Sequence, residues 1–223
     1  DDLLPYGSDP NTYWTGFYTS RPSFKYLARR AHVFLQVVKQ LSVIAHIGDT
    51  YELHLLRHAV SLILHHDTIT GTSQQHVAND FIRILSEAID TCTKKISSFI
   101  SILTSTWGNS RRSKNNQPFV VCHQLNMSQC RFLETHESVI VVVYNPLSTK
   151  TYHHVKLPAV ALHYSIRDYN DEEVEYQLVP LPSAVINLPG RSSSTIQELC
   201  FEAENIPPLG YSAYYITPIR DPL

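Results

Sequence analysis

The sequence has few glycines, a single methionine and no long apolar stretch. It holds 7 Gly and 1 Met among 223 residues, and it has no run of about 18 apolar residues that could form a transmembrane helix. No signal peptide is visible, and the first residues are Asp1-Asp2 rather than Met. We therefore expect a chain with no membrane partner that represents the middle of a longer protein.

An excess of basic charge is also lacking. The 18 Lys and Arg residues nearly balance 20 Asp and Glu residues, for a net charge of -2. Binding of nucleic acid requires a concentrated basic face, so none is expected as a partner. The one basic cluster, Arg111 to Lys114, lies among Asn and Ser residues and is typical of a solvated linker.

No familiar nucleophile or catalytic carboxylate pair stands out in the sequence. There is no Gly-x-Ser-x-Gly nucleophile elbow. Cys200 lies in an apolar run and is interpreted as a core residue. An acidic cluster is expected in a solvated turn between strands rather than as a catalytic pair, and it consists of Asp168, Asp171, Glu172 and Glu173.

Cysteine is sparse, but two of the four cysteines lie close together. Cys122 and Cys130 flank Asn126-Met127-Ser128, the only glycosylation sequon. This arrangement favours an exposed, disulfide-closed loop, glycosylated at Asn126, in a secretory compartment. The alternative is two reduced cysteines and an unused sequon, because cysteine spacing alone does not prove pairing.

The first half of the sequence has helical periodicity. After an irregular start that ends at Ser20-Arg21-Pro22, apolar residues recur at helical spacing from Ser23 to about Ile47 and from about Thr50 to His65. A third, long helix is expected to begin in a capping box, with Thr72 as N-cap and Gln75 three residues later. Three amphipathic helices with short connections predict an antiparallel bundle.

The second half is punctuated by proline and rich in β-formers. Beyond a polar linker at residues 108–118, the sequence predicts a small antiparallel, sandwich-like β domain. The whole chain is therefore expected to be α+β and multidomain. The expected strands cover residues 119–121, 138–144, 152–157, 173–178, 195–201 and 211–216.

The strongest chemical candidate is His65-His66-Asp67, where the second helix ends. A neutral imidazole nitrogen is a good zinc ligand, and an adjacent carboxylate can accept hydrogen bonds from hydroxyl groups. The alternative is a pair of histidines that cap the helix and interact with its dipole. A second metal candidate on one helical face, His54 with His58 and His65, is better explained as a polar outer face.

Three stretches resemble glycoside hydrolase family 38, in particular its lysosomal acid α-mannosidases. They are residues Tyr13 to Pro22, His65 to Asp80 and Val143 to Leu147, and the likeness covers nearly the whole chain. The resemblance implies that residues 1–20 end a catalytic α/β domain and that 21–107 form the middle-domain helical bundle. Residues 108–118 would be the linker, and residues 119–223 the β domain.

The resemblance also implies site roles. His66 matches a zinc ligand, Asp67 an acid that contacts mannose hydroxyls, and His65 a supporting residue. The family uses one Zn²⁺ per enzyme and two carboxylates in a retaining mechanism on mannose-containing oligosaccharides. Its other zinc ligands, in an Asp-x-His element and at the nucleophile, and its acid/base have no counterpart here. We therefore expect no catalytic residue in this fragment and no activity from it alone.

Further features follow from the same resemblance. Cys122 and Cys130 match a short-range disulfide of the family, whereas Cys92 faces Val38 where relatives have a cysteine partner, and it is expected to be a free thiol. The entry loop is altered to Pro5-Tyr6-Gly7-Ser8-Asp9. The resemblance also implies a lysosomal or secreted location and allows a homodimer of the full protein. A structural role is expected for Trp14, Arg21 and Asn145.

Three functions fit these observations. The first is a segment of a zinc-dependent α-mannosidase that acts with the missing N- and C-terminal parts of the same protein. The second is a catalytically dead, truncated paralogue that serves as a binding module. The third, more remote, is a stand-alone helical metal-binding protein that uses His54 and His58.

Overall fold

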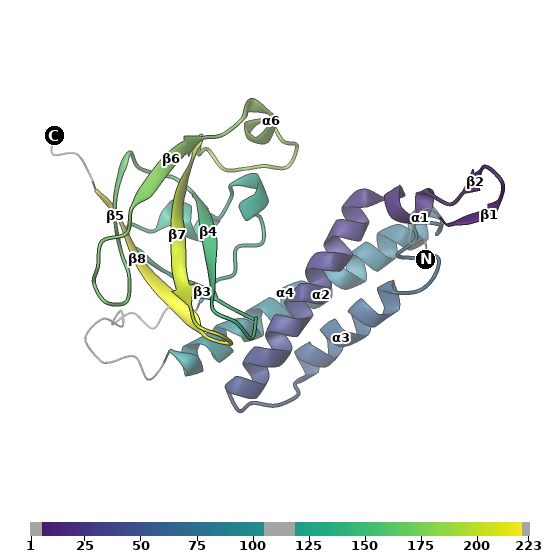
Figure 1. Ribbon diagram of the computed structural model, residues 1–223, viewed down its shortest axis with the longest axis horizontal. Helices are drawn as coiled ribbons and strands as arrows, with labels where there is room; N and C mark the ends of the chain where they lie inside the picture. Colours follow the sequence, from purple (N-terminus) through teal and green to yellow (C-terminus); the bar gives the residue numbers. More distant parts are fainter. Residues whose placement is uncertain (1–5, 105–118, 220–223) are drawn as a thin grey trace. The chain divides into compact units, whose positions relative to one another are not determined.

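The computed structural model describes residues 6–104 and 119–219. The chain divides into two compact units, residues 1–120 and 121–223 (Figure 1). The first is helical and the second is made mainly of antiparallel strands, which confirms the expected α+β class. Within the described residues, no helix has the length and apolarity needed to cross a membrane. The linker expected at residues 108–118, with Arg111 to Lys114, lies outside the described residues.

Three helices make up most of the first unit (Figure 1): α2 (Pro22–Ile44), α3 (Tyr51–Ile63) and α4 (Gln75–Leu103). Each contacts the other two. Ahead of them, the segment expected to be irregular contains the short hairpin β1 (Gly7–Asp9) and β2 (Thr12–Tyr13), and the single-turn helix α1 (Gly16–Thr19).

The apolar stripes that predicted these helices form the bundle core. Val38, Leu56 and Leu85, one from each helix, are completely buried. Burial of an aliphatic side chain of this size contributes about 1.5–3 kcal/mol. Thr50 begins α3 as an N-cap that accepts a hydrogen bond from the Leu53 N–H at 3.3 Å.

The predicted start of α4 is wrong. The helix begins at Gln75, its N-cap is Gln74, and no side chain caps it. The Thr72 hydroxyl instead donates to Asp67, and Gln75 accepts from Arg21. Tertiary contacts therefore occupy the two side chains that a capping box would have used.

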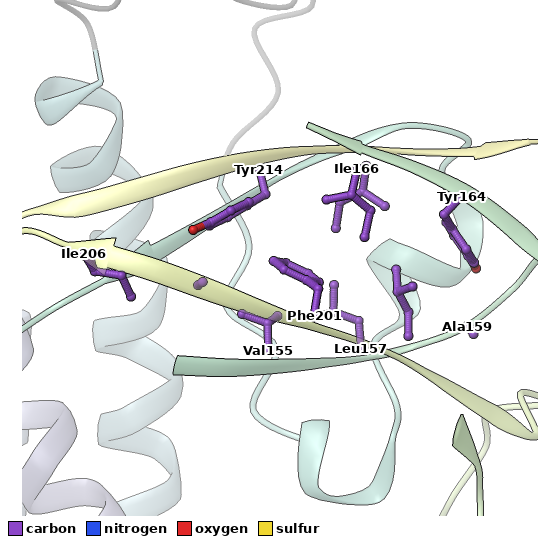
Figure 2. Packing of buried hydrophobic residues seen from close by; sticks show 11 residues of the cluster. Val155, Leu157, Ala159, Tyr164, Ile166, Phe201, Ile206 and Tyr214 are labelled. Carbon is purple, nitrogen blue, oxygen red and sulfur yellow. The ribbon is translucent and has the colours of Figure 1, made fainter. Parts of the chain in front are cut away.

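The second unit contains two three-stranded antiparallel sheets, in the orders β3-β8-β5 and β4-β7-β6. Their buried side chains form one core, in which the rings of Phe201 and Tyr214 lie 5.0 Å apart (Figure 2). The strands are β3 (Val139–Tyr144), β4 (Thr151–Pro158), β5 (His163–Arg167), β6 (Tyr176–Pro180), β7 (Gln197–Ile206) and β8 (Tyr211–Ile219). Short helices η1 (Leu125–Met127), α5 (Arg131–Thr135) and α6 (Ser183–Ile186) lie between them.

One predicted strand is absent, and one strand of the structure was not predicted. Residues 119–121 form no strand, since they pair with no neighbour and lead directly into the disulfide loop. The strand β5 was not predicted, because its five residues carry only two buried side chains, Tyr164 and Ile166. The strand expected at residues 173–178 lies at Tyr176–Pro180, with Glu173 in a single bridge to Arg167.

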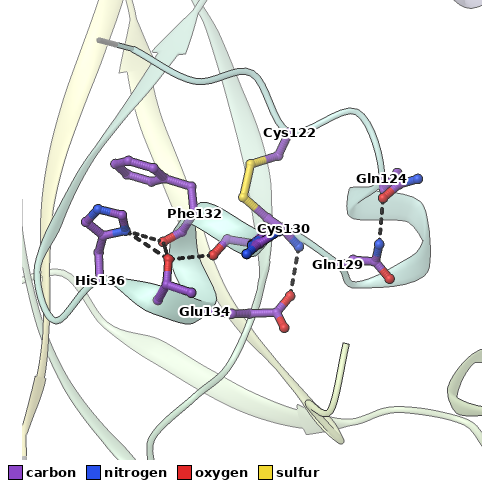
Figure 3. The surroundings of a disulfide bond; sticks show 9 residues. Cys122, Gln124, Gln129, Cys130, Phe132, Glu134 and His136 are labelled. Carbon is purple, nitrogen blue, oxygen red and sulfur yellow. Dashed lines mark hydrogen bonds between the residues drawn. A yellow bond between two sulfur atoms is a disulfide. The ribbon is translucent and has the colours of Figure 1, made fainter. Parts of the chain in front are cut away.

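The cysteines of this unit fall into two environments. Cys122 and Cys130 are joined by a disulfide, and the Cys130 N–H donates to Glu134 Oε1 at 3.0 Å (Figure 3). The interpretation of Cys200 as a core residue was wrong: it is half-buried on β7, between the buried Leu199 and Phe201, so its side chain points away from the core.

Candidate functional site

The candidate site is the turn between α3 and α4. The C-cap of α3 is Leu64, and the carbonyl of His65 accepts hydrogen bonds from the N–H groups of Thr68 and Ile69. Gly71 then reverses the chain with φ +81°, a conformation that L side chains rarely adopt. His65, His66 and Asp67 thus lie on a tight, internally bonded turn.

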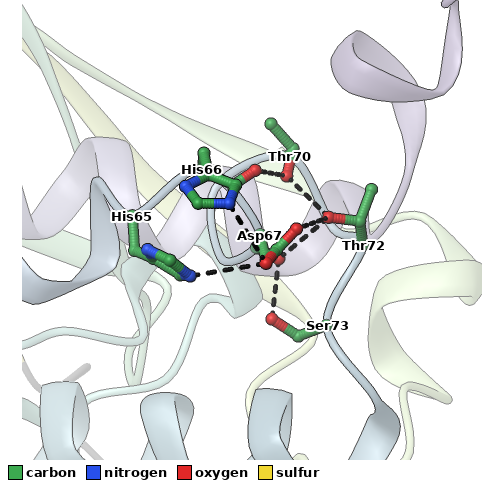
Figure 4. A network of polar contacts seen from close by, with 6 residues as sticks. All are labelled: His65, His66, Asp67, Thr70, Thr72 and Ser73. Carbon is green, nitrogen blue, oxygen red and sulfur yellow. Dashed lines mark hydrogen bonds and ion pairs between the residues drawn. The ribbon is translucent and has the colours of Figure 1, made fainter.

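The three candidate side chains come together at the surface (Figure 4). The Nε2 atoms of His65 and His66 lie 3.5 and 3.4 Å from the Asp67 Oδ2 atom. The two imidazole centroids are 4.3 Å apart. The side chain of His66 is 82% exposed, against 45% for His65. His66 is therefore the more accessible of the two to a ligand outside this unit.

Two hydroxyl groups hold Asp67. The Thr72 hydroxyl donates to its Oδ1 at 2.8 Å, and the Ser73 hydroxyl and N–H donate to its carbonyl at 2.7 and 2.9 Å. The Thr72 hydrogen bond holds the pKa of the Asp67 carboxyl below its usual value, and the charges of His66 and His65 act in the same direction. The carboxylate is thus ionised and its Oδ2 faces the histidines.

Residues at the start of α2 bind the loop at residues 71–73, which carries these hydroxyl groups. Arg21, with φ 52° at the N-cap of α2, donates from Nε to the Gly71 carbonyl at 3.2 Å and from a terminal nitrogen to the Ser73 carbonyl at 2.7 Å. Its other terminal nitrogen donates to Gln75. Ser20 adds a bond to the Gly71 carbonyl at 3.3 Å. Arg21, for which a structural role was expected, thus binds the backbone of the loop beside Asp67.

The contacts by which these hydroxyl groups and Arg21 support Asp67 were not predicted from the sequence. Thr70, whose hydroxyl donates to the His66 carbonyl and lies 3.1 Å from that of Thr72, was not singled out. The signal was the run of hydroxyl residues at positions 70, 72 and 73. The other histidine candidates, His54 and His58, do not join the cluster: in the described part of the chain, the group able to share a metal is His65, His66 and Asp67.

The donor set fits one side of a zinc site. Two imidazoles and a carboxylate offer one ligand atom each, all within 4.8 Å of one another, and nitrogen and oxygen are ligands that zinc accepts. All three side chains are close to half exposed or more. A tight site needs further ligands and protection from water, so this cluster is suited to complete a site rather than to form a closed one.

Comparison with known proteins covers both units. The family model of the alpha mannosidase middle domain matches residues 12–103, and that of the lysosomal alpha-mannosidase-like central domain matches residues 174–216. Lysosomal alpha-mannosidase of Bos taurus is 35% identical over 97% of this chain and 20% of its own length. An alpha-mannosidase of Arabidopsis thaliana is 32% identical over 97% of this chain and 23% of its own.

A crystal structure of an alpha-mannosidase from Enterococcus faecalis covers 93% of this chain and 25% of its own, at 12% identity and a TM-score of 0.49. The chain spans about a fifth of the length of the bovine and feline relatives that it matches.

Proposed function

Because the chain belongs to the α-mannosidase family, we propose that it is the middle section of a zinc-dependent glycosidase that hydrolyses terminal α-linked mannose in N-glycan oligosaccharides. The observation that carries the proposal is the cluster of His65, His66 and Asp67. It lies inside the stretch matched by the alpha mannosidase middle domain. Its donors converge on an exposed turn, as a contribution to a shared site requires.

In this proposal His66 supplies a zinc ligand through its exposed imidazole, and Asp67 accepts hydrogen bonds from mannose hydroxyls. Asp67 suits that role because one of its oxygens is already satisfied by Thr72 while the other faces the histidines. His65 supports the pair through its contact with the Asp67 carboxylate. The bound zinc would act as a template and Lewis acid for neighbouring sugar hydroxyls.

The retaining chemistry would come from two carboxylates outside this segment, one as nucleophile and one as acid/base. This section of the protein would therefore bind and orient the sugar rather than attack it. The names of the relatives favour a lysosomal location. Glycosylation of Asn126, which is exposed on the disulfide loop, accords with a secretory route.

Two measurements on the purified 223-residue chain test the proposal. The chain should not hydrolyse an aryl α-mannoside. Hydrolysis that a chelator abolishes would contradict the proposal that the two catalytic carboxylates lie outside this segment. Zinc titrated into the chain and followed by NMR should shift the His66 imidazole resonances first, with an affinity well below that of structural zinc sites, which gain about 10–16 kcal/mol.

The matched variants are His66→Ala, which should also abolish the zinc-induced shift of the neighbouring His65 imidazole, and His58→Ala, which should leave that shift unchanged. A zinc-induced shift of the His54 imidazole that survives His66→Ala and disappears with His58→Ala would instead support a metal site on the outer face of α3, where His54 and His58 are exposed.

A further inference from the structure

We propose that Thr72 and Arg21 are positioning residues for the mannose and zinc site, with Arg21 fixing the loop from which Thr72 orients the Asp67 carboxylate. This inference rests on the proposed function, in which the Asp67 carboxylate must be held in place to contact mannose hydroxyls beside the zinc. Neither residue touches the reacting groups, so both act through Asp67.

The first step of the argument is the Thr72 hydroxyl. It is 2.8 Å from Asp67 Oδ1, while both imidazoles approach Oδ2. One carboxylate oxygen is therefore anchored by the Thr72 hydroxyl, and the other is held beside the two imidazoles at the surface. Thr70 extends the chain of hydroxyls, since it lies 3.1 Å from the Thr72 hydroxyl and donates to the His66 carbonyl (Figure 4).

The second step is the loop itself. Residues 71–73 have no regular secondary structure to hold them, so their carbonyls need partners from elsewhere. The planar guanidinium of Arg21 supplies them at Gly71 and Ser73, about fifty residues away in sequence, at 3.2 and 2.7 Å. An ammonium group lacks this rigid fork, so lysine is a poor substitute at such a position.

The third step is that the Thr72 hydroxyl and the Arg21 guanidinium both act on Asp67. Ser73, whose carbonyl is bound by Arg21, also donates from its N–H and its hydroxyl to the Asp67 carbonyl. Thr72 lies between the two residues that Arg21 holds. Loss of Arg21 should therefore loosen both the backbone and the side chain of Asp67, whereas loss of the Thr72 hydroxyl should loosen only the side chain.

The test compares variants of the full chain by two readouts. The first is the χ1 rotamer of Asp67, from NMR three-bond couplings in metal-free protein. We expect one fixed rotamer in the parent chain and in Thr72→Ser, and averaged couplings in Thr72→Val and Arg21→Met. The second is zinc affinity, which should fall about 10-fold in Thr72→Val and be restored in Thr72→Ser, because the carboxylate that Thr72 orients contacts the His66 imidazole proposed as zinc ligand.

Matched controls separate positioning from general stability. Thr50→Val removes a threonine hydroxyl that caps α3, and Arg57→Met removes a guanidinium that pairs with Asp49 through two 3.1 Å bonds. Both should lower the unfolding temperature without averaging the Asp67 couplings or changing zinc affinity. Controls that affect Asp67 as strongly as Thr72→Val does would overturn the proposal.

The two hypotheses fail in different ways. If Thr72→Val and Arg21→Met leave the Asp67 rotamer fixed, the positioning role is wrong whatever the zinc affinity. If the parent chain shows the fixed rotamer and Thr72→Val loses it, but no zinc binds to the parent chain, the positioning role stands and the proposed zinc function is the part that fails.

Discussion

Arg191 donates from its Nε to the carbonyl of Met127 at 2.8 Å and so joins two loops of the β unit. Its terminal nitrogens bind the carbonyls of Ser193 and Thr195, both at 2.7 Å, and that of Ser128 at 3.2 Å. The guanidinium thus satisfies carbonyl groups on both sides of the junction. One side is the disulfide-closed loop that carries Asn126.

Replacement of Arg191 by Met should lower the free energy of unfolding by about 2–3 kcal/mol. The reason is that hydrogen bonds from a charged donor are lost and partly buried carbonyls are left without partners. Chemical denaturation followed by circular dichroism measures this. Arg167→Met is the control, because Arg167 donates to the carbonyl of Asp171 in an exposed turn. This substitution should lower the free energy of unfolding by less than about 1 kcal/mol. Equal losses in the two variants would show that the junction contributes nothing special.

Removal of the disulfide should also destabilise the β unit. A bridge that closes a loop of this size, with a sequence separation of 8, restricts the unfolded chain and contributes about 2–3 kcal/mol in the chain-entropy view. The double variant Cys122→Ser with Cys130→Ser should show that loss in denaturation experiments. Addition of a reductant should lower the stability of the parent chain by a similar amount and leave the double variant unchanged.

The sequence predicted the helices well because their burial is one-sided. The stripe containing Ala28, Ala31, Val38 and Leu41 is buried in α2, as its spacing indicated. The ends were harder to predict, since the start of α4 depends on where Thr72 finds a partner. That partner, Asp67, is outside the helix, and no local propensity indicates it.

The candidate site could be predicted only in part, for a similar reason. The residue types of His65, His66 and Asp67 suggested metal chemistry, and their adjacency in sequence kept them adjacent in space. Arg21 reaches the site from a distant segment through backbone carbonyls. Every residue has a backbone carbonyl, so residue types do not indicate which carbonyls Arg21 binds. These hydrogen bonds could be found only in the structure.

The two thiols should differ in reactivity. Burial raises the pKa of Cys92 to about 12, and its side chain is completely buried, so a maleimide added to native protein at pH 8 should leave it unmodified. Cys200, half-buried on β7, should react slowly. Mass spectrometry of digested protein identifies the modified residue. Labelling of Cys92 at the rate of Cys200 would contradict the buried position between the helices.

The same pKa predicts an alkaline effect on stability. The folded-state pKa of Cys92 lies above the ordinary value of 9.0, so the unfolded chain loses its proton first. The stability associated with the buried thiol is therefore fully present below about pH 9 and is lost as the pH rises toward about 12. Cys92→Ala should flatten this part of the profile in denaturation experiments at a series of pH values.

The last prediction concerns Gly71 and uses Gly48 as its matched control. Both have a positive φ, +81° and +78°, so alanine is strained by a similar amount at either position, about 1–2 kcal/mol. Their surroundings differ. A Cβ on Gly71 would lie 2.7 Å from the Ser20 hydroxyl and 3.0 Å from the Ser20 carbonyl, whereas a Cβ on Gly48 would meet nothing within 4 Å.

Gly71→Ala should therefore cost more stability than Gly48→Ala, by about 1–3 kcal/mol as for overpacking elsewhere. It should also disturb the site, because the Cβ would push residues 71–73 away from Ser20 and Arg21, which fix the loop around Asp67. Averaged χ1 couplings of Asp67 in Gly71→Ala, with unchanged couplings in Gly48→Ala, are the expected result. Equal stability losses and equal couplings would mean that the loop can move aside freely, and the close approach of the α2 start to this turn would then have no bearing on the site.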